Sequence, residues 1–201
     1  MLSIYVLKPA FQQLLRPIVS ALARAGATAN QVTVATVVVS AATGLALFIR
    51  PETPAIWLLL PLVLLLRMGL NAIDGMLARE HNMESRLGSI LNELGDVISD
   101  AALYLPFTMV PGLSSALVVA TVLVAIASEM TGVLGIQIGA NRRYDGPMGK
   151  SDRAVVFGAS GLALGLGIAA GAWLQAVLAA TLVLLVMTIV NRARRALEVA
   201  T

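Results

Sequence analysis

Four polar side chains interrupt two long apolar stretches in the middle of the chain, and they are the residues best suited to do chemistry. They are Asn71, Asp74, Asn92 and Asp96, within the segment NAIDGMLAREHNMESRLGSILNELGD at 71–96. Polar and ionised groups at membrane depth are costly and usually mark a functional site. Carboxylates that converge from two helices are suited to a hard divalent cation such as Mg²⁺, which proteins commonly share with substrate phosphates.

The elements that must position these side chains are membrane-spanning helices. The chain of 201 residues is 58% hydrophobic and 12% charged, with a mean hydropathy of +0.87, whereas a soluble domain carries about 25% charged residues. Apolar runs of roughly 20 residues, the length that crosses a bilayer, recur along the sequence. We predict an all-α membrane protein, a single integral membrane domain over 1–201. Its six transmembrane helices are expected at 30–49, 55–79, 84–109, 112–139, 152–170 and 173–193.

The first 25 residues follow a different pattern and predict an amphipathic helix that lies in the membrane interface, ahead of the six-helix domain at 26–201. Apolar residues recur there at helical spacing between basic ones: Phe11, Leu14, Leu15, Ile18 and Leu22. Pro17 is expected to bend or split this helix. Thr28 and Gln31 have the spacing of a capping box at the start of the first span.

The basic residues indicate how the chain is oriented. They gather before the first span, around the loop at 79–86, around the loop at 142–153 and at the C-terminus, whereas the other loops carry only Arg50. With six alternating helices these clusters fall on one side, so we expect both termini and the site to face the cytoplasm, at a bacterial inner membrane. Because the charge lies at helix ends, a pI of about 9.8 does not indicate a nucleic-acid partner.

The helical repeat places the polar residues on shared faces. Asn71 and Asp74 lie on one face of the second span together with Arg67, and Asp96 and Asp100 share a face of the third span with Asn92. Asp74 lies about 7 Å below Arg79, and Asn92 about 9 Å beyond Arg86, at 1.5 Å per residue. These similar depths predict a polar pocket that opens to the cytoplasm. Arg67 is expected to form a salt bridge to Asp74 or Asp100, or else to contact phosphate.

Small residues in the same segment leave room for a flat group to approach the backbone. They are Gly75, Ala78 and Gly88, whose side chains are short or absent. Together with the paired carboxylates, they indicate phosphoryl transfer from a nucleotide-linked substrate.

The segment resembles the signature of the CDP-alcohol phosphotransferases, D-x2-D-G-x2-A-R-x8-G-x3-D-x3-D. Six of its eight fixed positions match at the family spacing, and Asn71 and Asn92 replace the first and third aspartates. The resemblance extends to the TANQVT stretch at 28–33 and the GPMGKSDR loop at 146–153. It implies transfer of a substituted phosphate group from a CDP-alcohol, foremost CDP-diacylglycerol, to an acceptor alcohol, with release of CMP in phospholipid biosynthesis. It also implies Mg²⁺ or Mn²⁺ as cofactor and a possible homodimer.

The resemblance assigns roles residue by residue. It implies that Asp74 and Asp96 bind metal, with Asp96 also the general base on the acceptor hydroxyl. The positions of Asn71, Asn92 and Asp100 make them further candidate ligands, and the two asparagines predict one cation in place of two, since an amide offers oxygen without charge. The residues implied to bind the nucleotide are Gly75, Ala78, Arg79, Gly88, Asn30 and Thr33. Lys150 and Arg153 are candidates for binding the acceptor.

Other interpretations of these residues stay open. The asparagines also suit a family member that has lost transfer and serves as a nucleotide- or lipid-binding membrane subunit, and buried acids also occur in small transporters. Lys150 and Arg153 are equally explained as topology signals. Glu129 in the fourth span is expected to pair with a neighbouring helix, and His81 to be a solvated loop residue.

Overall fold

The fold is all-α, and every helix lies close to a predicted one. The computed structural model describes residues 7–199, which form eight α-helices and one short 3-10 helix. In chain order these are α1 (Leu7–Arg24), α2 (Ala29–Ile49), α3 (Pro54–Trp57), α4 (Leu59–Glu80), α5 (Arg86–Tyr104), η2 (Leu105–Met109), α6 (Ser115–Gln137), α7 (Lys150–Gly165) and α8 (Ala172–Val199). The predicted second span is therefore α3 followed by α4, and the third is α5 followed by η2.

Four stretches within the described residues are long and apolar enough to cross a membrane. They are Ala29–Ile49, Pro54–Glu80, Ser115–Gln137 and Ala172–Val199, which confirms an integral membrane protein. The other two expected spans are helical but do not meet the same test. Helix α5 carries four charged residues, and α7 has 16 residues, or about 24 Å at 1.5 Å per residue, against about 30 Å of hydrocarbon.

Helix α7 is shorter than predicted because a glycine ends it before residue 170. Gly167 has φ +84°, a conformation that glycine adopts without steric cost. Its N–H donates to the Leu164 carbonyl at 3.0 Å, and the Ile168 N–H donates to the Ala163 carbonyl at 3.0 Å. This pair of bonds is the Schellman arrangement that satisfies the last carbonyls of a helix.

The described residues gather into two compact units. One contains the chain up to Ala42 together with Val63–Ser99, and the other contains Thr43–Leu62 and the chain from Asp100 onward. The prediction of one membrane domain over 1–201 stays a prediction.

In the first unit, α1 packs on α2 and α4 through one apolar face. Leu15 and Val19 of α1 lie in a cluster with Val32 of α2 and with Ile73 and Leu77 of α4. An adjoining face of α1 is also apolar and is exposed, with Leu14 and Ile18. The helix is continuous through Pro17, so Pro17 does not split it. The start of α2 is as predicted, because Thr28 and Gln31 exchange side-chain-to-backbone hydrogen bonds of 2.9 and 3.2 Å.

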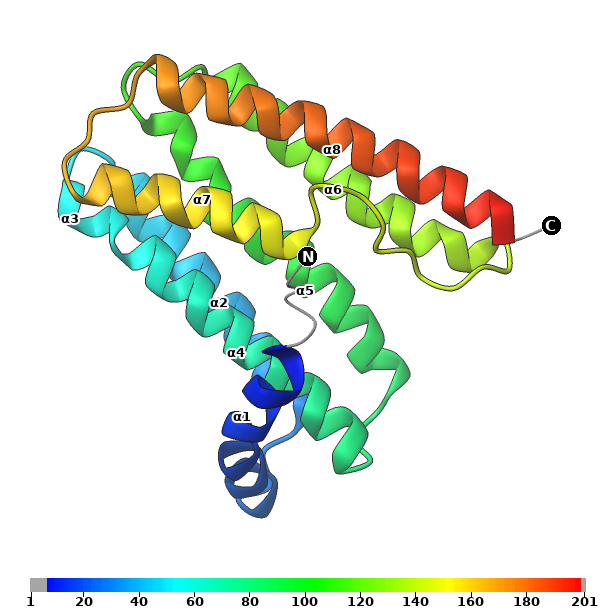
Figure 1. The fold of residues 1–201 in the computed structure, drawn as a ribbon. Helices are drawn as coiled ribbons and strands as arrows, with labels where there is room; N and C mark the ends of the chain where they lie inside the picture. The colour runs from blue at the N-terminus through cyan, green and yellow to red at the C-terminus, as the bar shows by residue number, and fades with distance from the viewer. Residues whose placement is uncertain (1–6, 200–201) are drawn as a thin grey trace. The chain divides into compact units, whose positions relative to one another are not determined.

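In the second unit, α6 and α8 run alongside each other (Figure 1). Glycines allow other helices of this unit to approach closely. A Cβ on Gly44 of α2 would overlap the backbone oxygen of Ala102 in α5, and a Cβ on Gly161 of α7 would lie 2.8 Å from Cδ2 of Leu60. These small residues therefore pack helices against one another.

Candidate functional site

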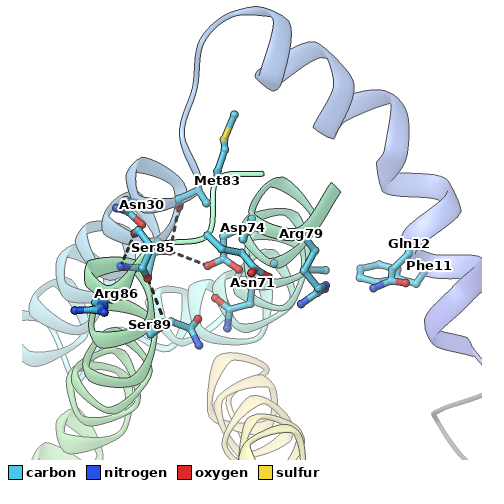
Figure 2. A pocket seen from close by; sticks show the side chains of 18 residues that line it. Phe11, Gln12, Asn30, Asn71, Asp74, Arg79, Met83, Ser85, Arg86 and Ser89 are labelled. Atoms are coloured by element: carbon cyan, nitrogen blue, oxygen red, sulfur yellow. Dashed lines mark hydrogen bonds between the residues drawn. The ribbon is translucent and has the colours of Figure 1, made fainter. Parts of the chain in front are cut away.

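The first unit contains a cavity of about 770 Å³, within the range usual for small-molecule sites. It is lined by the start of α2, the C-terminal half of α4, the following loop and the start of α5, with Phe11 and Gln12 of α1 at one side (Figure 2).

Nine of the predicted site residues line this cavity: Asn30, Thr33, Asn71, Asp74, Gly75, Ala78, Arg79, Gly88 and Asn92. The four that do not line it are Asp96, Asp100, Lys150 and Arg153. The cavity thus brings together the whole predicted nucleotide-binding set and three of the five candidate metal ligands. The role of each residue stays a prediction.

Asp74 is the buried carboxylate of the cavity wall. It is 5% exposed, and the Thr33 hydroxyl lies 2.9 Å from its Oδ2 and donates to it. Thr33 is on the second turn of α2, so this bond joins α2 to α4 at the cavity.

Asp96 is held from α4 by two donors. Nδ2 of Asn71 lies 3.2 Å from its Oδ1. Nη2 of Arg67 lies 2.8 Å from its backbone oxygen and 3.5 Å from Oδ1. The predicted partners of Arg67 were Asp74 or Asp100. The ion pair to Asp96 is a contact that the sequence did not suggest, because it depends on how α4 crosses α5 and a helical repeat does not specify that crossing. The pairing with Asp74 or Asp100 stays a prediction.

At two glycines of the predicted nucleotide-binding set, neighbouring side chains occupy the space that a Cβ would fill. A Cβ on Gly88 would lie 2.7 Å from Oδ1 of Asn30 and 3.0 Å from Oγ of Ser85. A Cβ on Gly75 would lie 3.1 Å from Nη2 of Arg79. The missing side chains therefore let Asn30 and Arg79 lie close to the helix backbones at the cavity.

The electrostatics of the cavity favour an anion at one side. The first turns of α2 and α5 both line it, and a helix N-terminus carries a partial positive charge with N–H groups that lack intrahelical partners. Ser85 caps α5, because its Oγ accepts from the Gly88 N–H at 2.9 Å. Arg79 and Arg86 add two cationic side chains to the lining. Phosphate groups are the natural ligand for this arrangement.

The residues present fit a single hard cation better than a pair. Asp74, Asn71 and Asn92 offer carboxylate and amide oxygens at the cavity wall, which are ligands of Mg²⁺ and Mn²⁺. Among the residues that the structure describes, however, no three His, Cys, Asp or Glu side chains are grouped to hold a metal ion. One divalent ion shared with substrate phosphates is compatible with this donor set.

The remaining candidates, Asp100, Lys150 and Arg153, belong to the second unit, where Asp100 and Arg153 take part in a buried ionic cluster. Arg153 is 1% exposed, and its Nε and Nη2 donate to Oδ2 of Asp100 at 3.0 and 2.8 Å. Its Nη1 donates to Glu129 at 3.0 Å. Glu129 also pairs with Arg192 of α8 at 3.4 Å, which confirms that it bridges neighbouring helices. Lys150 is the first residue of α7 and is half-buried.

Sequence reasoning missed several residues around the cavity. Ser85, Ser89 and Arg86 line it from the start of α5, and Met83 lines it from the loop. The signal for Ser85 was present, because serine is a preferred N-cap and precedes the helix by one residue. His81 is exposed at the end of α4, as predicted.

Comparison with known proteins identifies the family. Residues 26–190 match the model of the CDP-alcohol phosphatidyltransferase family. The chain belongs to this family. The CDP-alcohol phosphatidyltransferase signature at 71–96 is thus the segment that supplies most of the cavity wall described above.

Relatives and solved structures agree with the membership in this family. The chain is 46% identical over 196 residues to the Inner membrane protein YnbA of Escherichia coli, covering 98% of this chain and 97% of that one. Phosphatidylinositol phosphate synthase (PgsA1) of Mycobacterium tuberculosis with CDP-DAG bound is similar in fold, with a TM-score of 0.72, 22% identity, and coverage of 92% and 94%. The same synthase in complex with manganese and citrate gives a TM-score of 0.70 at 24% identity, with coverage of 90% and 87%.

Proposed function

We propose that this protein transfers a substituted phosphate group from a CDP-alcohol to an acceptor alcohol and releases CMP. The observation that carries the proposal is the single cavity in which an acidic, oxygen-rich wall around Asp74 lies beside an anion-attracting wall formed by Arg79 and two helix N-termini. A nucleotide-linked pyrophosphate needs the anion-attracting wall, and its divalent cation needs the oxygen-rich wall. Family membership supports the same reaction class.

The donor that we propose is CDP-diacylglycerol. A protein of similar fold was crystallised with CDP-DAG bound, and a lipid donor suits a cavity carried by membrane-spanning helices. We propose six spans in all, with α5 and α7 as the two that carry polar or shorter segments, and both termini on the cytoplasmic side of a bacterial inner membrane. The relative from Escherichia coli is itself named as an inner membrane protein.

The reaction needs nucleotide positioning and one proton transfer. Gly75, Ala78 and Gly88 would admit the cytidine, and Arg79 would hold its phosphates. Asp96 does not line the cavity itself but is bonded to Asn71 of the cavity wall. It would accept the proton of the acceptor hydroxyl as the new oxygen–phosphorus bond forms and the bond to CMP breaks. Mg²⁺ or Mn²⁺ bound at Asp74 would supply charge neutralisation of the pyrophosphate.

A second function is favoured by one observation. Asn71 and Asn92 give the cavity wall amide oxygens where carboxylates would bind a cation more strongly, and Asn71 is already bonded to Asp96. A subunit that binds CDP-linked lipid without turning it over would have such a wall. A small transporter has no support from the family match.

The test is release of labelled CMP from CDP-diacylglycerol by the purified protein, with a panel of alcohols and alcohol phosphates and with Mn²⁺ or Mg²⁺. We expect release with at least one acceptor, and at least a hundredfold loss in Asp96→Ala, which is the order contributed by a general base. Glu52→Ala is the matched control, since Glu52 is an exposed acid. Tight CDP binding without CMP release from any acceptor would favour the binding subunit.

A further inference from the structure

The carboxylate of Asp96 meets a fixed pair of donors on one face of α4. Arg67 and Asn71 are four residues apart, so their side chains are neighbours on the helix surface. Both reach Oδ1 of Asp96, at 3.5 Å from Nη2 of Arg67 and 3.2 Å from Nδ2 of Asn71. A third bond, 2.8 Å from Nη2 of Arg67 to the backbone oxygen of Asp96, fixes the guanidinium relative to α5.

Arg67 is not a solvated charge that happens to lie nearby. Its side chain is 4% exposed, and that of Asp96 is 17% exposed. A guanidinium removed from water is costly unless an anion and well-placed acceptors compensate it. Arg67 therefore brings a permanent positive charge to the carboxylate of Asp96.

We propose that Arg67 is a positioning residue which, together with Asn71, takes the place of a second divalent cation beside Asp96. The site then holds one divalent ion, on the Asp74 side of the cavity, and Asp96 is held by hydrogen bonds instead of by metal. The proposed catalytic role of Asp96 rests on the function proposed above, whereas the number of ions does not depend on it.

The charges of the described residues support one ion. Two divalent ions in one site lie about 3.5–4 Å apart and repel each other unless several carboxylates surround them. Asp74 and Glu84 are the acids of the cavity lining within the described residues, and Arg67 adds a charge of the same sign as the ions. Asp96, which does not line the cavity, already has its cationic partner.

The experiment counts bound Mn²⁺ by electron paramagnetic resonance on the purified protein in the presence of CDP. We expect one Mn²⁺ per chain with the spectrum of an isolated ion. In Asn71→Asp a second carboxylate would face Asp96, so we expect two bound ions with a spin-coupled spectrum. In Arg67→Gln we expect Mn²⁺ affinity to rise by about tenfold, because a charge of the same sign as the ion is removed from α4, about 10 Å along the helix from Asp74. Arg50→Gln, which removes an exposed arginine, should change neither the number nor the affinity.

A structural role for Arg67 alone would predict unchanged or weaker Mn²⁺ binding in Arg67→Gln, and either result would overturn the proposal. Should that variant fail to fold, Arg67→Lys serves instead: it keeps the positive charge, so its Mn²⁺ number must stay at one and its Mn²⁺ affinity close to that of the wild type. Two coupled ions in the wild type would also overturn the inference, and CMP release under those conditions would leave the proposed function intact. One isolated ion without CMP release from any acceptor would support the inference and remove the proposed function.

Discussion

Arg153 offers the most decisive perturbation, because it separates a structural ion pair from an acceptor-binding residue. Arg153→Gln keeps much of the side-chain volume and removes the charge. It abolishes two hydrogen bonds to Asp100, of 3.0 and 2.8 Å, and one of 3.0 Å to Glu129. Glu129 keeps Arg142 and Arg192 within 3.4 Å.

The expected cost follows from burial. Arg153 is 1% exposed and Asp100 5%, and removing one partner of a buried ion pair costs about 3–5 kcal/mol. For a chain of this length each kcal/mol lowers the Tm by about 2–4 °C, so we expect a fall of roughly 6–20 °C. The double variant Asp100→Asn with Arg153→Gln should recover much of it, because no uncompensated charge remains.

The assay is thermal unfolding of the purified variants in one detergent, followed by intrinsic fluorescence, with CMP release measured at several acceptor concentrations. Arg50→Gln is the control, and its Tm should change by no more than the equivalent of about 0.5 kcal/mol. The reasoning is refuted if Arg153→Gln melts within about 2 °C of the wild type. A selective rise in the acceptor KM in that case would assign Arg153 to acceptor binding.

Two glycine substitutions test the close approaches. In Gly88→Ala the new Cβ would lie 2.7 Å from Oδ1 of Asn30, which is the end of a side chain that can rotate away. We therefore expect an unchanged Tm in thermal unfolding. Calorimetry should show a CDP affinity about tenfold weaker, or about 1.4 kcal/mol. In Gly44→Ala the Cβ would overlap the backbone oxygen of Ala102, which cannot rotate away. We expect a loss of stability of at least about 1–3 kcal/mol. A Tm equal to that of the wild type would show that the helices do not cross so closely.

The sequence was sufficient where local rules determine structure. The Thr28–Gln31 capping box follows from residue type and a spacing of three, and it is present. Helix positions were predictable because apolar runs separated by Pro and Gly signals leave little choice of boundary. Clustering of Asn71 and Asp74 with Gly88 in one cavity follows from the helical repeat on two helices joined by a short loop.

The sequence was insufficient where a long side chain selects among several partners. The sequence suggested Asp74 or Asp100 as partners of Arg67 and did not suggest Asp96, with which the structure shows an ion pair. Arg153 is next to a predicted loop, so the sequence suggested acceptor binding or a topology signal. In the structure its side chain is instead buried and bonded to Asp100 of α5 and Glu129 of α6. Such contacts depend on tertiary packing between segments up to 53 residues apart. The helical repeat of the sequence does not predict which of these segments lie together.

Helix α1 has one further consequence for how the protein works. It contributes Phe11 and Gln12 to the cavity while it presents Leu14 and Ile18 outward, and such outward apolar groups are suited to immersion among headgroups and upper acyl carbons. If α1 lies in the membrane interface as predicted, the surrounding lipid supports one side of the cavity. We therefore expect CDP affinity to change when the lipid composition is altered or the bilayer is replaced by detergent.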